Sequence, residues 1–170
     1  YNIPYTSKLI SKNILNIVKS KKFADGLIRK KTEVFLGKIL NSKNIILTQS
    51  CTSALEACIS ICGIGINDEV ILPSYTFTST ANCIIMNKAK PVFADIDSKT
   101  LNLDPKDVEK RITKKTKAII LVHYNGLPCN ISEFIKLKKK YNLFLIEDCA
   151  HALTAKYKNK SPIKTSTFIL

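Results

Sequence analysis

The sequence predicts an α/β fold, a three-layer sandwich in which helices cover both faces of a mostly parallel sheet. Two observations lead to this prediction. Short runs rich in β-branched residues alternate along the chain with longer segments whose apolar residues recur at helical spacing. The chain has 170 residues, of which 45% are hydrophobic, so it can bury a substantial core. Connections between parallel strands are right-handed, and ligands gather where such strands end.

Helices and strands are expected in strict alternation after two initial helices. The initial helices are predicted at Ser7–Lys19 and Ile28–Leu40, with a glycine-permitted bend at Ala24–Gly26 between them. The expected strands are Asn44–Thr48, Glu69–Leu72, Pro91–Ala94, Ala118–Val122 and Leu143–Glu147. The intervening helices are Thr52–Cys62, Ser79–Met86, Pro105–Arg111 and Ile131–Lys139.

A single domain is expected over residues 1–170, because no internal repeat or low-complexity linker divides the chain. The last stretch, Lys156–Leu170, is rich in lysine and serine and finishes on an apolar run that makes neither a helix cap nor a complete element. The sequence therefore reads as a chain cut short.

The net charge of +14 raises the question of nucleic-acid binding. The lysines are spread along the whole chain in short runs beside predicted helix ends, which is typical of solvated surface. We therefore expect no nucleic-acid partner. The sequence also has no apolar stretch of about 18 residues and no secretory signal, so a cytoplasmic protein without membrane contact is expected.

The six cysteines form no Cys-x-x-Cys pair and lie mostly among apolar neighbours. Cys58 and Cys62 have a spacing compatible with metal binding, but no second His or Cys pair accompanies them. Buried free thiols and no metal site are therefore expected.

Three segments combine side chains that could carry chemistry. Thr48–Glu56 is a hydroxyl-rich turn that leads into a helix, where free amides and the helix dipole favour an anion such as phosphate. Ordinary N-capping by Ser50 or Thr52 is the alternative interpretation.

The second segment, Ile146–His151, ends an apolar strand with two adjacent acids and an imidazole. One acid must face inward, and a carboxylate at this edge can pair with a protonated ring nitrogen, as a pyridine cofactor requires. Capping of the next turn by an Asp is the alternative. The third segment, Pro73–Asn82, brings aromatic and hydroxyl groups to the same edge, although Phe77 taken alone would be assigned to the core.

Together these segments resemble the sugar aminotransferases of the DegT/StrS group, which belong to the aspartate-aminotransferase fold type of enzymes that use pyridoxal 5′-phosphate (PLP). The resemblance extends from Ile3 to Lys158. It rests on four motifs in order: Pro73–Phe77, Val92–Ile96, Val122–Gly126 and Glu147–His151. Within the group, the segments Leu47–Glu56 and Val122–Tyr124 are most similar to the enzyme that aminates dTDP-4-oxo-6-deoxyhexose at C4.

The resemblance implies a cofactor site. Cys51 and Thr52 would bind the PLP phosphate, Phe77 would stack on the ring, Asp148 would pair with the pyridinium nitrogen, and His151 would approach the phenolic oxygen. Many relatives have Gly where this chain has Cys51 and Gln where it has His151. Both replacements keep a backbone N–H or a hydrogen-bonding group.

The resemblance also implies the reaction. An amino group would pass from an amino acid, expected to be glutamate, to a nucleotide-linked keto sugar for surface polysaccharide synthesis, in a homodimer. No catalytic residue is assigned, because the Schiff-base lysine and the C-terminal small domain of the family are absent from these residues. The chain alone is therefore expected to be inactive. The alternative is a non-catalytic remnant of a truncated or frame-shifted aminotransferase gene.

Overall fold

The computed structural model describes residues 6–23, 26–153, 155–157 and 167–170. The chain divides into two compact units, residues 1–47 and 48–170, and each is described by itself. The lysines Lys158, Lys160 and Lys164 lie outside the described residues. None of the described helices is both long and apolar enough to span a membrane.

The first unit contains two helices, α1 (Lys8–Ser20) and α2 (Leu27–Leu40), within one residue of the predicted bounds. Ser7 caps α1, because its side chain accepts a hydrogen bond from the Ile10 amide. Each helix ends at a residue in the left-handed region, α1 at Lys21 and α2 at Asn41. Neither helix fully buries a side chain, and most apolar residues of both are exposed.

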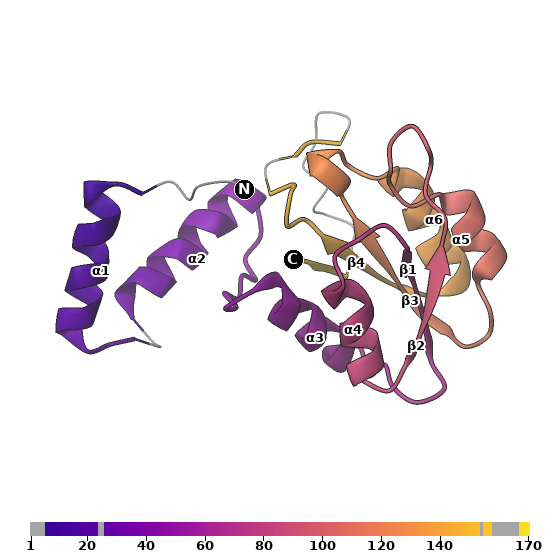
Figure 1. The fold of residues 1–170 in the computed structure, drawn as a ribbon, viewed down its shortest axis with the longest axis horizontal. Coiled ribbons are helices and arrows are strands. Elements are labelled where there is room, and N and C mark those ends of the chain that lie inside the picture. Colours follow the sequence, from indigo (N-terminus) through magenta and orange to yellow (C-terminus); the bar gives the residue numbers. More distant parts are fainter. Residues whose placement is uncertain (1–5, 24–25, 154, 158–166) are drawn as a thin grey trace. The chain divides into compact units, whose positions relative to one another are not determined.

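The second unit is built on a five-stranded sheet in the order β2-β1-β3-β4-β5 (Figure 1). Every pair of neighbouring strands is parallel, as predicted. The strands are β1 (Glu69–Pro73), β2 (Lys90–Ala94), β3 (Thr116–Val122), β4 (Phe144–Asp148) and β5 (Phe168–Ile169).

Helices cover both faces of this sheet, which confirms the three-layer prediction. They are α3 (Cys51–Ile61), α4 (Ser79–Met86), α5 (Pro105–Arg111) and α6 (Ile131–Tyr141). Side chains alternate along β3, so Ile120 packs with α3 and α4 whereas Ile119 packs with α5 and α6. The sheet therefore separates two apolar cores, and Figure 1 shows the two helix pairs on opposite sides.

The strand order contains a switch point between β1 and β3. The chain leaves β1 through α4 on one face to reach β2, then returns through α5 on the other face to reach β3. The loops after β1 and β3 therefore diverge and open a crevice at the carboxyl ends of these strands, the usual ligand position in such sheets.

Two predictions are wrong, one for the residues between α2 and α3 and one for the last residues of the chain. Residues Asn44–Thr48 form no strand, because they pair with no neighbour in the described structure, and Ile46 is 82% exposed. Their β-branched run fits a pleated, half-buried surface, but here it has none to pack on. Conversely, Phe168–Ile169 forms the edge strand β5 beside β4, where no complete element was expected.

The cysteines follow the prediction closely. All six are free, four are buried, and Cys51 and Cys62 are half-buried. Burial raises the pKa of the Cys58 and Cys62 thiols to about 11, so both stay protonated at neutral pH.

Glu69, at the start of β1, makes a pH-dependent contribution to the free energy of unfolding. It is only 7% exposed, accepts hydrogen bonds from the Thr113 hydroxyl at 2.6 Å and the Lys90 amine at 3.1 Å, and these bonds lower its pKa. Its stabilising effect is therefore present above the unfolded-state pKa of about 4.3 and lost as the pH falls through the lower folded-state pKa. We expect Glu69→Gln to cost about 1–2 kcal/mol at pH 7 and the difference from the parent protein to shrink below about pH 4.

Urea denaturation across this pH range measures the effect. Glu133→Gln, which removes an exposed charge, is the control and should leave the stability nearly unchanged. A Glu69→Gln deficit that stayed constant down to pH 3 would contradict the assignment.

Candidate functional site

A cavity of about 450 Å³ opens at the carboxyl ends of the strands, beside the switch point. All five residues that the sequence singled out line it, together with two tyrosines. The lining residues are Cys51, Thr52, Tyr75, Thr76, Phe77, Ser79, Tyr124, Asp148, Ala150 and His151. Side chains from four separate stretches of the chain thus meet in one place.

The N-terminus of α3 forms one wall of this cavity. Ser50 is the N-cap, and its side chain accepts a hydrogen bond from the Ser53 amide at 3.1 Å. Among the described residues no acceptor is recorded for the amides of Cys51 and Thr52, which precede the first intrahelical bonds. The capping interpretation is therefore correct for Ser50, and it leaves two free N–H groups where the helix dipole favours an anion.

Asp148 ends β4 at the floor of the cavity and is 7% exposed. Its Oδ1 accepts hydrogen bonds from the Ala150 amide at 3.0 Å and from the Cys51 thiol at 3.5 Å. Burial, with the added effect of the Asp148 charge, raises the pKa of the Cys51 thiol to about 12. Cys51 is therefore a neutral donor here, and the negative charge of the site belongs to Asp148.

Aromatic rings form the opposite wall. The Tyr75 and Tyr124 hydroxyls are 2.9 Å apart, and their ring centroids are 4.7 Å apart. The hydrogen bond with Tyr75 is the main cause that raises the pKa of Tyr124. The imidazole of His151 meets the Tyr124 ring edge-on, with centroids 6.3 Å apart. Phe77 is 75% exposed, so its assignment to the core was wrong, and its ring is available at the cavity.

Sequence reasoning did not assign a role to Tyr75 or Tyr124. The usable signal was position, because Tyr75 follows β1 and Tyr124 follows β3, the two strands that flank the switch point. A short 3₁₀ turn, Tyr124–Gly126, carries the second tyrosine. Gly126 has φ +81°, and an added Cβ would lie 3.2 Å from the His151 carbonyl oxygen, so both the backbone conformation and the close approach to His151 favour glycine here.

Comparison with known proteins identifies the family of this chain. Residues 4–167 match the DegT/DnrJ/EryC1/StrS aminotransferase family. The chain belongs to this aminotransferase family. A spore coat polysaccharide biosynthesis protein of Bacillus subtilis, SpsC, is 36% identical over 160 residues, which are 94% of this chain and 41% of SpsC.

Two further relatives support the family membership. The GDP-perosamine synthase of Escherichia coli O157:H7 is 44% identical over 109 residues, 64% of this chain and 30% of that enzyme. The Streptococcus pneumoniae protein Spr1654, solved in a PMP-form and a PLP-form, superposes with a TM-score of 0.90 and 27% identity, over 99% of this chain and 48% of Spr1654. This chain therefore spans less than half the length of each of these relatives.

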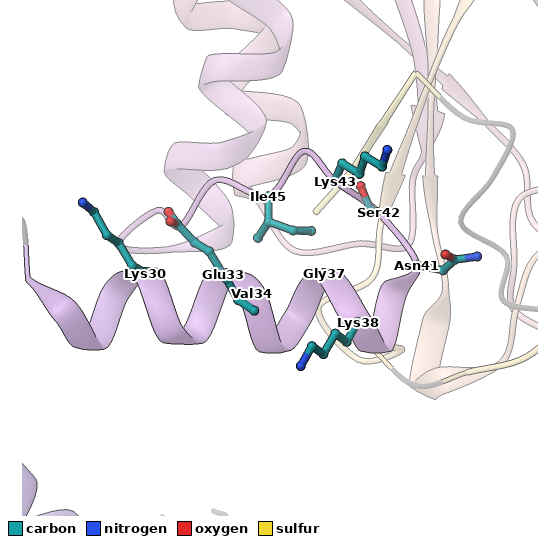
Figure 2. A pocket seen from close by; sticks show the side chains of 9 residues that line it. All are labelled: Lys30, Glu33, Val34, Gly37, Lys38, Asn41, Ser42, Lys43 and Ile45. Atoms are coloured by element: carbon teal, nitrogen blue, oxygen red, sulfur yellow. The ribbon is translucent and has the colours of Figure 1, made fainter.

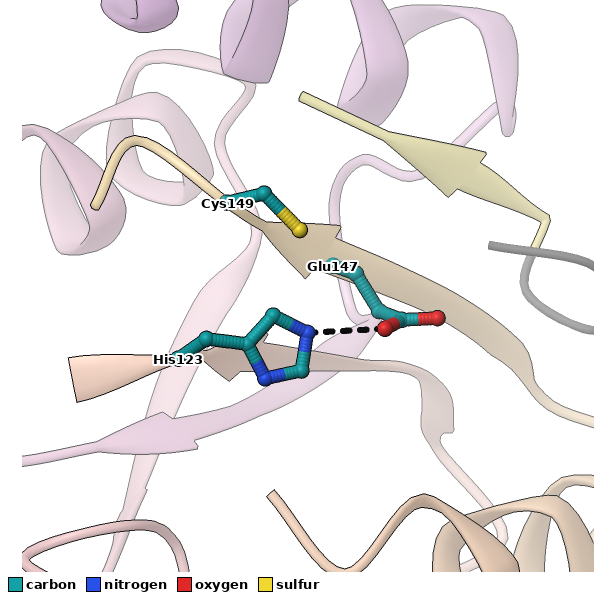
Figure 3. A group of neighbouring side chains, drawn as sticks. All are labelled: His123, Glu147 and Cys149. Carbon is teal, nitrogen blue, oxygen red and sulfur yellow. Dashed lines mark hydrogen bonds and ion pairs between the residues drawn. The ribbon is translucent and has the colours of Figure 1, made fainter. Parts of the chain in front are cut away.

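Glu147, the other acid of the Glu147-Asp148 pair, faces away from the cavity that Asp148 lines. Both acids are buried, but Asp148 points to the α3 side and Glu147 to the α6 side, where its Oε2 lies 2.7 Å from His123 Nε2 (Figure 3). One acid was expected to face inward. Both acids do so, on opposite faces of the sheet.

His123, Glu147 and Cys149 have potential metal ligands within 4.8 Å of one another. The imidazole, however, has no lone pair to offer. Its Nδ1 accepts a hydrogen bond from the Cys129 amide at 3.0 Å, so the ring proton lies on Nε2 and is donated to Glu147. This hydrogen-bonding pattern favours a buried polar pair over a metal site.

A larger hollow of about 770 Å³ lies within the first unit, along α2 and the segment after it. Figure 2 shows the side chains of Lys30, Lys38 and Lys43 pointing in different directions around it. Its charged groups do not converge on one point, so size alone does not make it a ligand site.

Proposed function

We propose that this chain forms the cofactor-binding part of a sugar aminotransferase, which transfers an amino group from an amino acid to a nucleotide-linked keto sugar. The family and its structural neighbours are sugar aminotransferases. The observation that carries the proposal is the meeting of two free α3 amides, the Asp148 carboxylate and the Phe77 ring in one cavity.

The donor set of the cavity fits PLP, the cofactor that the family and the PLP-form neighbour imply. The free amides of Cys51 and Thr52 would bind the phosphate, because they lie at a helix N-terminus. The Asp148 carboxylate would hold a proton on the ring nitrogen, since an adjacent negative charge favours the protonated ring. Bound PLP supplies an electron-withdrawing ring that stabilises negative charge on the amino-bearing carbon of its substrate.

The remaining residues orient and cover the ring. Phe77, whose side chain is exposed at the cavity, would stack on one face of the cofactor ring. His151 would donate a hydrogen bond toward the phenolic oxygen, and its position is fixed by Tyr124 and Gly126. The Cys51 thiol would donate its hydrogen bond to Asp148 Oδ1 and so leave the second carboxylate oxygen for the cofactor.

The substrates are proposed from the relatives. The names of GDP-perosamine synthase and of the spore coat protein SpsC support a nucleotide-linked sugar and a polysaccharide product. Within that class we infer dTDP-4-oxo-6-deoxyhexose as the acceptor, from the resemblance of Leu47–Glu56 and Val122–Tyr124, and glutamate as the donor, from the resemblance to the family as a whole. The homodimer stays a prediction of the family resemblance, and the cytoplasmic location stays a prediction from the sequence.

Binding of pyridoxamine 5′-phosphate (PMP) tests the proposal on the 170-residue chain. PMP is preferable to PLP, because the PLP aldehyde would react with the many surface lysines. We expect saturable binding, followed by PMP fluorescence, and binding of unphosphorylated pyridoxamine at least about tenfold weaker, since the α3 amides recognise the phosphate. Equal affinities for the two amines, or no saturable binding, would refute it.

A turnover assay completes the test. The chain spans less than half of its relatives, and none of its lysines from Lys156 onward stands in the context that the family's catalytic lysine requires. We therefore expect the 170 residues alone to show no sustained glutamate-dependent transamination.

A further inference from the structure

The turn that carries Tyr124 is held by a side chain that does not line the cavity. Asn102 is 4% exposed, and its Oδ1 accepts a hydrogen bond from the Tyr124 amide at 3.0 Å. Its Nδ2 donates to the Leu127 carbonyl oxygen at 2.9 Å. One buried amide therefore closes both ends of the turn, which fixes the direction in which the Tyr124 ring leaves the backbone.

His123 holds the same segment from the preceding residue. Its backbone amide donates to the Asp148 carbonyl oxygen at 3.1 Å, and its ring Nδ1 accepts from the Cys129 amide at 3.0 Å. The ring is kept in this tautomer by Glu147, which accepts the Nε2 proton at 2.7 Å. The His123–Glu147 pair thus links the carboxyl ends of β3 and β4 just behind the cavity.

Stability alone does not account for this pair. Glu147 and His123 are fully buried, and Glu147 Oε1 has no hydrogen-bond partner within the described part of the chain. A buried carboxylate with one unpaired oxygen is costly, and well-packed apolar residues commonly stabilise a core at least as well. The pair therefore calls for a role beyond packing.

We propose that Asn102 and the His123–Glu147 pair are positioning residues, which from outside the cavity hold Tyr124 against Tyr75 and His151. The placement of Tyr124 follows from the hydrogen bonds above. Its consequence for cofactor binding rests on the proposed function.

Fluorine NMR of the 170-residue chain, labelled with 3-fluorotyrosine, measures the placement without any ligand. Tyr75→Phe and Tyr124→Phe assign the two resonances. We expect Asn102→Leu and Glu147→Leu to shift and broaden the Tyr124 resonance and to lower the PMP affinity about tenfold. The conservative variant Glu147→Gln, which keeps the acceptor for His123 Nε2, should restore most of both signals. Asn102→Asp, which keeps the acceptor for the Tyr124 amide but loses the donor to the Leu127 carbonyl oxygen, should restore only part of them.

Leu137→Ala is the matched control. Leu137 lies on α6, in the apolar core between this helix and the sheet, and its side chain makes no hydrogen bond to Asn102, His123 or Glu147. The Leu137→Ala substitution should lower the melting temperature but leave the Tyr124 resonance and the PMP affinity unchanged. If Leu137→Ala moved the resonance as much as Asn102→Leu, the effect would be general loosening and the proposal would fail.

The parent protein provides an independent check that needs no variant to fold. Long-range ¹⁵N–¹H spectra should show the His123 ring proton on Nε2, and a proton on Nδ1 would overturn the assignment. Failure of the parent chain to bind PMP would count against the proposed function only. Unchanged Tyr124 resonances in Asn102→Leu and Glu147→Leu would count against the positioning role only.

Discussion

Replacing Asp148 by asparagine is expected to weaken PMP binding about a hundredfold. A hydrogen bond between charged groups contributes about 1.5–3 kcal/mol, and a buried site such as this one, 7% exposed, belongs at the upper end of that range. The neutral amide would keep the Oδ1 acceptor for the Ala150 amide, so the turn after β4 should persist. It would no longer stabilise a proton on the ring nitrogen.

Fluorescence titration with PMP gives the affinity, and urea denaturation verifies that the fold is retained. Glu133→Gln is the control, because it removes one negative charge at an exposed position on α6. Its affinity should equal that of the parent chain. An Asp148→Asn variant that bound PMP within threefold of the parent would show that the cofactor nitrogen lies elsewhere.

Replacing Phe134 by alanine should give the largest loss of stability, about 3–5 kcal/mol. Phe134 is fully buried and packs in the core between α6 and the sheet, where its loss leaves a cavity. Because a domain of this size has a total stability of about 5–15 kcal/mol, a large part of it would be lost.

Urea denaturation followed by circular dichroism measures this change. Phe144→Ala is the matched control: the same substitution on β4, at a residue 38% exposed, should cost much less. Equal costs at the two positions would mean that the core between α6 and the sheet is not packed as described.

The sequence was sufficient for most of the second unit because its elements are locally determined. Buried strands such as β1 and β3 read as continuous apolar runs, and α5 begins at a proline preceded by the capping Asp104. The edges were harder. A strand forms only where it can pair with a neighbouring strand. In the described structure residues 44–48 have no such neighbour, whereas Phe168–Ile169 pairs with β4, and the local sequence reveals neither fact.

The candidate site divides in the same way. Cys51, Asp148 and Phe77 could be assigned because each stands in a motif at the end of a predicted element. The contact between Tyr75 and Tyr124 could not be predicted, because it depends on β1 lying beside β3, and strand order is a property of the whole sheet. The side chain of Asn102 reaches the Tyr124 turn across 22 positions of sequence, which no spacing rule would suggest.

The adjacency of Glu147 and Asp148 has a consequence for how this protein can change over generations. Successive residues of a strand face opposite ways, so inserting or deleting a single codon just before this pair would exchange the two carboxylates between the ligand cavity and the His123 side. A single insertion or deletion would thus remove both the Asp148 contact with Cys51 and the Glu147 contact with His123. Insertions and deletions at the end of β4 should therefore be tolerated only when they change the length by an even number of residues, whereas the loops beyond β4 have no such restriction.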